Sequence, residues 1–373
     1  MSRPLVDIRL EGVSAAAQPG PALHDVSFHV RYGEFFTVLG PPHSGKSAVL
    51  RAIAGFLPLS AGRIVVDGED ISRLPPRRRG LGYVFHQGAL WPHVAVEDQV
   101  AFGLEQQGLG RGAIEERLRL VLRRLRLEEV RRARPADLTL DQQRRLALAR
   151  ALAIEPRVLL LDEPLAHLDP VSRKTLRLEL AKLHIDLAVT TICATRDAAD
   201  ALALSNRLAI VQDGRVIQTG EPEELYQRPL TPAAAEALGP ATFLPVRVVE
   251  VRDLGVVVET EHGDRVPVAG IGQFGVGDAG VLVLRPETMA ITEAAEAYGP
   301  GIPGRVAVRV FEGARYLYEV DVGCSAPIRV ELPAGRDTGV FRLGDRVRVA
   351  MSSETMVLLP GAPTSGAGAR ISE

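Results

Sequence analysis

From Val6 to Val216 the chain alternates continuous apolar runs with longer stretches in which apolar residues recur at helical spacing. Continuous apolar strands between helices are typical of a parallel sheet that is covered on both faces. Helical spacing at 113–127 and 141–153 predicts two helices between two of the strands. The pattern therefore predicts an α/β fold with an inserted helical subdomain at about 88–153. The strand-like runs lie at 26–30, 35–39, 83–85, 158–161, 190–194 and 208–211.

A segment rich in proline and alanine, at 227–240, ends this alternation. Beyond it, short strand-like runs are separated by Gly, Pro and Asp turns, without long helices between them. This second pattern predicts a small, all-β barrel, and it divides the chain into domains at 1–235 and 241–373. The runs lie at 246–251, 255–259, 280–284, 304–310, 315–322, 327–331 and 345–350.

Composition and charge narrow the classes of function. The formal net charge is -2 and the sequence pI is about 6.5, so the chain has no overall basic field to hold a nucleic acid. The two cysteines, Cys193 and Cys324, lack the spacing of a zinc site or a redox pair, which favours a reducing compartment. The sequence shows no signal-peptide pattern and no run of ~20 apolar residues. We therefore expect any membrane association to come through a partner.

A phosphate-binding loop follows the strand-like run at 35–39. It has the pattern G-x-x-x-x-G-K-[ST] between a strand and a helix, the context that this motif requires. Its glycines allow backbone N–H groups to surround a phosphate at the positive end of the helix. The lysine then offers charge to the β- and γ-phosphates of ATP, and the serine offers a hydroxyl to Mg²⁺. The residues are Gly40, Pro41, Pro42, His43, Ser44, Gly45, Lys46 and Ser47, with Ala48 next in the helix.

Two carboxylates end the apolar run at 158–161. Asp162 is placed to hold Mg²⁺, and Glu163 is placed to polarise an attacking water as the general base. An apolar run that ends in Asp-Glu is weak evidence alone. Together with the phosphate loop it predicts a P-loop NTPase.

Longer segments resemble the ABC transporter ATPases, within the import subunits of the spermidine/putrescine, ferric iron and sugar type. They lie at 84–104, 138–152, 159–169 and 214–229, and read VFHQGALWPHVAVEDQVAFGL, LTLDQQRRLALARAL, LLLDEPLAHLD and GRVIQTGEPEELYQRP. Downstream, VLRPETMAI and LGDRVRVAMSSETMVLLP look like the OB-like accessory (TOBE) domain of that group. The resemblance implies a RecA-like core followed by this β domain.

The resemblance also implies partners. Two ATPases form a sandwich dimer, in which the phosphate loop of one faces the signature motif of the other, and the second copy is either identical or a different subunit. Each docks a transmembrane permease subunit near 86–92, where Trp91 is either a docking contact or a core residue. The chain would then sit at the inner face of the cell membrane, act indirectly with a solute-binding protein and bind no nucleic acid.

Several positions depart from the family pattern at the catalytic centre. His86 stands where the family has a glutamine, and Arg196 stands where it has the switch histidine. Arginine can hold a phosphate, but it cannot accept a hydrogen bond as neutral histidine does. Ala17 and Ala166 replace an adenine-stacking aromatic residue and a serine.

The signature motif, usually Leu-Ser-Gly-Gly-Gln, also differs. Thr139 keeps a hydroxyl and Gln142 is retained, but Leu140 and Asp141 replace the glycines. A carboxylate ~4 Å from a phosphate charge costs about 4 kcal/mol at an effective dielectric near 20. Asp141 is therefore expected to repel the nucleotide, unless its side chain turns away.

Two functions follow from these features. The first is an ABC importer ATPase that hydrolyses ATP, weakly, to drive uptake of a small solute such as iron, polyamine or phosphonate. The second is a nucleotide-binding regulatory or structural subunit with little turnover. A nucleic-acid-handling ABC protein is disfavoured, because the chain has no second phosphate loop.

Overall fold

The computed structural model describes residues 6–16, 22–269, 274–293, 301–335 and 340–361. The chain divides into two compact units, 1–223 and 224–373. Two short helices, α7 (Pro222–Gln227) and α8 (Pro232–Ala237), lie at or just after this division. The domain limits of 1–235 and 241–373 stay a prediction.

The centre of the first unit is a six-stranded sheet in the order β10-β9-β3-β8-β7-β6. The pairs from β9 to β6 are parallel, and β10 is antiparallel to β9. Every residue of β3, β7 and β8 is buried, because both faces are covered. This confirms the predicted parallel sheet. Its strands are β3 (Phe35–Leu39), β6 (Leu81–Val84), β7 (Val158–Asp162), β8 (Thr190–Thr195), β9 (Arg207–Gln212) and β10 (Arg215–Gly220).

One face of this sheet packs against helix α1 (Lys46–Ala54) and a second, antiparallel sheet. Alternate residues such as Phe36, Val38 and Leu160 point to this side and join its core. The residue pattern predicted only part of β2, because the other strands alternate polar and apolar residues. The second sheet has the order β2-β1-β4-β5, with strands β1 (Ile8–Ala15), β2 (Leu23–Val30), β4 (Ala61–Val66) and β5 (Glu69–Asp70).

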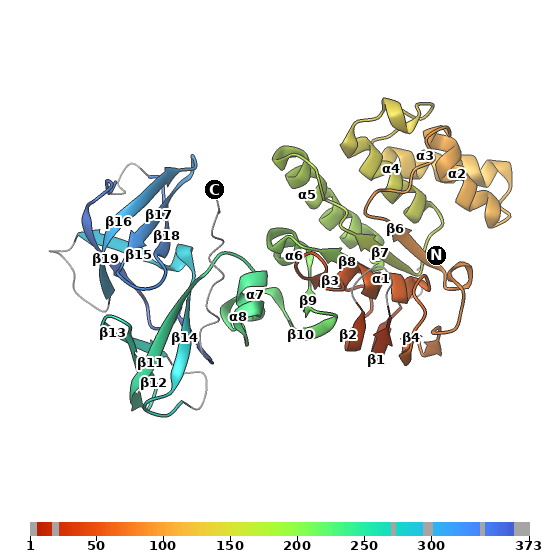
Figure 1. Ribbon diagram of the computed structural model, residues 1–373. Coiled ribbons are helices and arrows are strands. Elements are labelled where there is room, and N and C mark those ends of the chain that lie inside the picture. The colour runs from red at the N-terminus through yellow and green to blue at the C-terminus, as the bar shows by residue number, and fades with distance from the viewer. Residues whose placement is uncertain (1–5, 17–21, 270–273, 294–300, 336–339, 362–373) are drawn as a thin grey trace, which may run out of the picture. The chain divides into compact units, whose positions relative to one another are not determined.

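The other face packs against helices. Phe35, Leu159 and Leu161 point to this side and share a core with the inserted helices. Figure 1 shows α2, α3 and α4 gathered into one group, which confirms the inserted helical subdomain. The helices of the unit beyond α1 are α2 (Val96–Gln106), α3 (Arg111–Arg124), α4 (Leu140–Ala153), α5 (Pro170–Leu187) and α6 (Ala198–Leu204).

The second unit is all-β apart from its short helices. Its described strands form two antiparallel five-stranded sheets, in the orders β13-β12-β11-β14-β20 and β15-β19-β16-β17-β18. The two sheets share one core, in which Val248 and Leu282 from the first meet Tyr318 and Val330 from the second. The all-β class is confirmed, but the strands divide into two sheets where a single small barrel was expected.

The first of these sheets contains β11 (Thr242–Arg252), β12 (Gly255–Thr260), β13 (Arg265–Ala269), β14 (Ala279–Leu284) and β20 (Val357–Pro360). The second contains β15 (Ala290–Glu293), β16 (Gly301–Phe311), β17 (Arg315–Asp321), β18 (Ile328–Pro333) and β19 (Arg346–Ala350).

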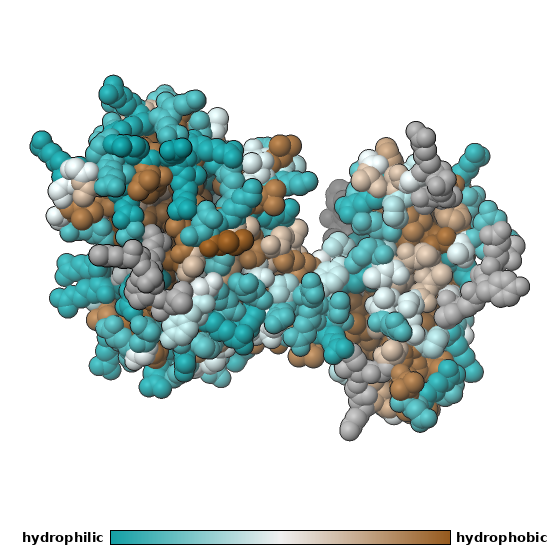
Figure 2. Space-filling view, turned by 180° about the vertical axis from the view of Figure 1, so that it is seen from behind, coloured by the Kyte–Doolittle hydropathy of each residue, from teal (hydrophilic) through white to brown (hydrophobic). Residues whose placement is uncertain are grey.

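The face of the first unit seen in Figure 2 is mostly hydrophilic, with hydrophobic spots between the polar side chains. No helix in the described part of the chain is both long and apolar enough to cross a membrane.

Candidate nucleotide site

The loop between β3 and α1 has a backbone that only glycine fits at two points. A Cβ on Gly40 would lie 2.3 Å from the carbonyl oxygen of Val211, and Gly45 has a φ of 103°. Gly45 is also the residue before the first turn of α1, whose N–H groups have no preceding turn to accept them. The loop therefore presents free backbone donors and the positive end of a helix dipole.

Side chains of the loop fit a bound phosphate as well. Ser44 is buried, and its Oγ has no hydrogen-bond partner among the described residues. Lys46 is buried too, and its Nζ donates to the carbonyl oxygen of Pro41 at 3.2 Å. Pro41, Pro42 and His43 are exposed. An orphaned hydroxyl and a buried ammonium in one loop are donors that a phosphate group would satisfy.

The carboxylate at the end of β7 lies against the start of α1. Ser47 Oγ donates to Asp162 Oδ1 at 2.8 Å, and Tyr83 Oη donates to Asp162 Oδ2 at 3.2 Å. Burial raises the pKa of Asp162, and these two hydrogen bonds act in the opposite direction. Burial also raises the pKa of Tyr83, and the charge of Asp162 adds to the effect, so the phenol stays protonated. A hydroxyl and a carboxylate are ligands that Mg²⁺ prefers, so this pair fits the metal.

Glu163 follows in a strained backbone conformation. Its φ is 49°, in the left-handed region, and its N–H donates to the carbonyl oxygen of Ala194 at 2.8 Å. This geometry turns the carboxylate toward two cations and an imidazole. Glu163 Oε1 lies 3.2 Å from Lys46 Nζ, and Oε2 lies 3.7 Å from His86 Nδ1 and 4.0 Å from Arg196 Nε.

The structure thus brings Lys46, Ser47, His86, Asp162, Glu163 and Arg196 into one cluster. The carboxylate of Glu163 is therefore paired with Lys46, the buried cation of the loop.

The signature residues lie apart from this cluster, at the start of α4. Thr139 Oγ1 accepts from Gln142 N–H at 3.2 Å, and Gln142 Oε1 accepts from Thr139 N–H at 2.9 Å, which forms a capping box. Among the described residues, no hydrogen bond or ion pair joins Thr139, Asp141 or Gln142 to the phosphate loop. Their predicted contact is with the nucleotide of a second copy, which a single chain does not contain.

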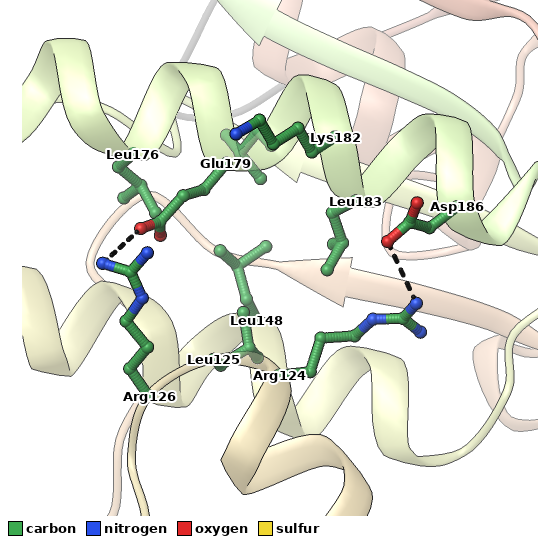
Figure 3. Close-up of a pocket in the computed structure, with 10 residues that line it drawn as sticks. Arg124, Leu125, Arg126, Leu148, Leu176, Glu179, Lys182, Leu183 and Asp186 are labelled. Atoms are coloured by element: carbon green, nitrogen blue, oxygen red, sulfur yellow. Dashed lines mark hydrogen bonds and ion pairs between the residues drawn. The ribbon is translucent and has the colours of Figure 1, made fainter.

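Asp141 is paired within its own chain, which changes the expected repulsion. Asp141 Oδ2 lies 2.6 Å from Nε of Arg145, one turn later in α4, and Arg145 is buried. The guanidinium also pairs with Glu179 on α5. Figure 3 shows that Glu179 in turn pairs with Arg126 across a hollow between the helices, at 3.0 Å. The negative charge of Asp141 is therefore neutralised within α4, and the expected cost of about 4 kcal/mol does not apply to this conformation.

This pairing predicts a loss of stability on removing the carboxylate. Asp141→Ala leaves the buried Arg145 with one partner fewer, and should lower the free energy of unfolding by about 2 kcal/mol. Denaturant unfolding of the full chain measures the change. The exposed Glu116→Ala, on α3, is the control and should stay within about 0.5 kcal/mol of the unmodified chain. Equal stability of the two variants would mean that the Asp141 carboxylate is free.

A groove runs beside the nucleotide cluster, between β6 and helices α2 and α4. Trp91 lines it, half-buried, with its ring edge-to-face with Phe102 at 5.0 Å and the guanidinium of Arg150 at 4.3 Å from its centre. Tyr83 and Phe85 line the same groove. The groove is thus formed by aromatic side chains with a cation at its wall.

Sequence reasoning missed two residues of the site. Tyr83 was assigned only to a strand, although its hydroxyl contacts Asp162. Arg144, buried in α4, donates to the carbonyl oxygens of His86 and Ala166 and so joins the signature helix to the two loops beside Glu163. Nothing in the sequence shows these contacts, because they join residues far apart in the chain. Ala17, expected in place of an adenine-stacking ring, lies outside the described residues.

Known proteins are similar to this chain over most of its length. Residues 23–166 match the ABC transporter family, and residues 282–359 match the TOBE domain. The spermidine/putrescine import ATP-binding protein of Rubrobacter xylanophilus is 35% identical over 358 residues, which is 95% of this chain and 94% of that protein. Its counterpart in Thermotoga maritima is 38% identical over 294 residues, 77% of this chain and 78% of that protein.

Solved structures are similar as well. A dimeric ATP-binding cassette in a post-hydrolysis state, bound to ADP and Pi, covers 58% of this chain and 98% of its own, with a TM-score of 0.53 at 26% identity. The cbiO1 protein of Clostridium perfringens, part of an ABC transporter complex, covers 59% and 90%, with a TM-score of 0.54 at 29% identity. The chain therefore belongs to the ABC transporter family, as the ATP-binding subunit of an importer with a TOBE domain.

Proposed function

We propose that this subunit binds Mg-ATP in the loop 40–47 and hydrolyses it with Glu163 as general base. The observation that carries the proposal is the ion pair of Lys46 with Glu163 at 3.2 Å, beside the Ser47–Asp162 hydrogen bond at 2.8 Å. These four side chains supply the phosphate cation, the two magnesium ligands and the base from one edge of the sheet. Magnesium bound there would neutralise charge on the phosphates.

The ion pair gives the site an order of events. Phosphate oxygens compete with Glu163 for Lys46, and they are the stronger partner because they carry more charge and also meet the backbone donors of α1. Glu163 then loses its closest cation and is free to orient a water. Hydrolysis is thereby linked to occupation of the loop.

Turnover is proposed to be slow. Arg196 has a fixed positive charge 4.0 Å from the Glu163 carboxylate and has no acceptor atom for the attacking water. Leu140 exposes an apolar side chain at the start of α4, where the resemblance places a glycine against the partner's nucleotide. The second candidate, a regulatory subunit with little turnover, rests on the same two residues. Asp141 no longer supports it, because its charge is paired.

The active form is proposed to be a dimer of ATPases, homodimeric or with a second subunit, as the dimeric cassette among the solved relatives supports. The groove with Trp91, Phe102 and Arg150 is proposed to receive a transmembrane permease subunit. The chain would then act on the cytoplasmic face of the membrane. A solute-binding protein would deliver the solute to the permease from the opposite face.

The solute is proposed to be a polyamine. The two relatives named above are spermidine/putrescine import proteins, which favours polyamine over iron or phosphonate. The test measures uptake of labelled spermidine by cells that lack the gene for this subunit. The cells are complemented with the unmodified chain or with Glu163→Gln. Restoration by the unmodified chain alone is expected. Restored iron or phosphonate uptake without spermidine uptake would contradict it.

Lys46→Ala should weaken Mg-ATP binding at least about hundredfold. The variant removes the one buried cation at the loop, and charge-assisted contacts to phosphate are the strongest in such a site. Calorimetric titration of the full chain measures the affinity. Lys174→Ala, exposed on α5, is the matched control and should bind as the unmodified chain does. Unchanged affinity of Lys46→Ala would show that the loop is not the nucleotide site.

A further inference from the structure

Tyr83 touches both the magnesium aspartate and the groove. Its hydroxyl donates to Asp162 Oδ2 at 3.2 Å, and its ring is part of the groove wall. The register of the two strands explains how Tyr83 reaches Asp162. In the parallel pair of β6 with β7, Tyr83 lies opposite Leu160, so Asp162 is two residues further along the same face. A tyrosine at this position reaches Asp162, whereas an aliphatic side chain would not supply a donor.

The ring of Tyr83 is held by other aromatic side chains. Its centre lies 4.3 Å from that of Phe85, at a tilt of 40°, and 5.8 Å from that of Phe56, nearly edge-on. Phe85 and Phe56 are both well exposed, at 36% and 51%. Both rings contact the ring of Tyr83, whose hydroxyl binds Asp162, so Tyr83 connects them to this carboxylate.

Each carboxylate oxygen of Asp162 accepts a hydrogen bond from a different hydroxyl group. Ser47 binds Oδ1 and Tyr83 binds Oδ2, so the two hydroxyls together fix the rotation of the carboxylate. If the Tyr83 hydrogen bond is absent, Oδ2 loses its donor and the carboxylate can rotate about the Ser47 contact. Partners of this kind commonly change metal affinity ten- to hundredfold.

We propose that Tyr83 is a positioning residue that orients Asp162 for magnesium, and that the Phe56–Tyr83–Phe85 cluster passes the state of the groove to this carboxylate. The inference rests on the proposed function, in which Asp162 holds the metal and the groove receives the permease.

The test measures the ATP affinity of the full chain by calorimetry in EDTA and in saturating magnesium. The dissociation constant in EDTA divided by the dissociation constant in magnesium measures how much the metal strengthens ATP binding. A purely structural role of Tyr83 would not change this ratio selectively. Tyr83→Phe keeps the ring and removes the hydroxyl. We expect the ratio to fall about tenfold or more, with the affinity in EDTA unchanged within about twofold. The exposed Tyr32→Phe is the matched control and should leave the ratio as it is.

A double-mutant cycle tests the cluster. Phe85→Ala should lower the ratio when Tyr83 is present, and should have no further effect when combined with Tyr83→Phe. Phe311→Ala, an exposed ring of the second unit, is its control.

A normal ratio in Tyr83→Phe, or additive effects in the cycle, would overturn the inference while leaving the proposed function intact. An unmodified chain that shows no magnesium-dependent ATP binding would overturn both.

Discussion

Glu163→Gln will abolish steady-state ATP hydrolysis and at the same time strengthen ATP binding. A general base contributes about 10² to 10⁴ in rate, so turnover should fall by roughly a thousandfold or to background. Binding should improve, because the carboxylate that competes for Lys46 at 3.2 Å is replaced by a neutral amide. The loss of one such ion pair is worth about 1 kcal/mol, or roughly fivefold in affinity.

Phosphate release and calorimetry on the same preparation separate the two effects. Glu116→Gln, on the exposed side of α3, controls for the loss of one carboxylate and should change neither quantity. A Glu163→Gln chain that hydrolyses ATP at the unmodified rate would exclude Glu163 as the base. A chain that loses both binding and turnover would instead show that the Lys46 ion pair organises the loop.

The second large effect concerns Arg196 and Leu140, the two departures that the proposed function places against a nucleotide. Arg196→His combined with Leu140→Gly should raise the ATPase rate of the purified chain at least about tenfold. Histidine restores a group that can accept a hydrogen bond near Glu163, and glycine lets the start of α4 approach a partner's phosphate. Single contacts in a transition state are typically worth 10² to 10³ in rate, so tenfold is a conservative expectation.

Asp141 is kept in this variant, because its carboxylate is paired with Arg145 at 2.6 Å. Adding Asp141→Gly should give no further acceleration and should cost stability. A third variant with Arg196→Lys, which keeps the charge, should stay as slow as the unmodified chain. If the unmodified chain already matches the Arg196→His and Leu140→Gly variant, these residues do not limit turnover, and Arg196 performs the switch role itself.

Buried, continuous elements were the most predictable part of the fold. The run 35–39 coincides with β3, because a strand that is buried on both faces is apolar almost throughout, here in every residue except Thr37. The antiparallel strands β1 and β4 were missed, since each has one exposed or partly exposed side and carries Glu11 or Arg63 in its middle. The pattern of residues also could not predict how the strands of the second unit divide into two sheets, because strand pairing is decided by contacts between distant residues.

The candidate site, like the fold, could be predicted only in part from the sequence. Motif spacing located Lys46, Ser47, Asp162 and Glu163, and the structure brings them together. The pairing of Asp141 was visible in principle, because Arg145 lies four residues later on the same helix face. The contact of Tyr83 with Asp162 was not, because it depends on the register of β6 against β7. Local sequence therefore predicts the chemistry better than the side-chain orientation.

In the proposed function, ATP replaces Glu163 at Lys46 within the loop 40–47. An experimentally determined structure of the Glu163→Gln chain with Mg-ATP tests it most directly. We expect the triphosphate in the loop, Lys46 Nζ on phosphate oxygens and no longer beside residue 163, and the metal on Ser47 and Asp162. A nucleotide bound elsewhere, or a filled loop in which Lys46 remains beside residue 163, would contradict the account.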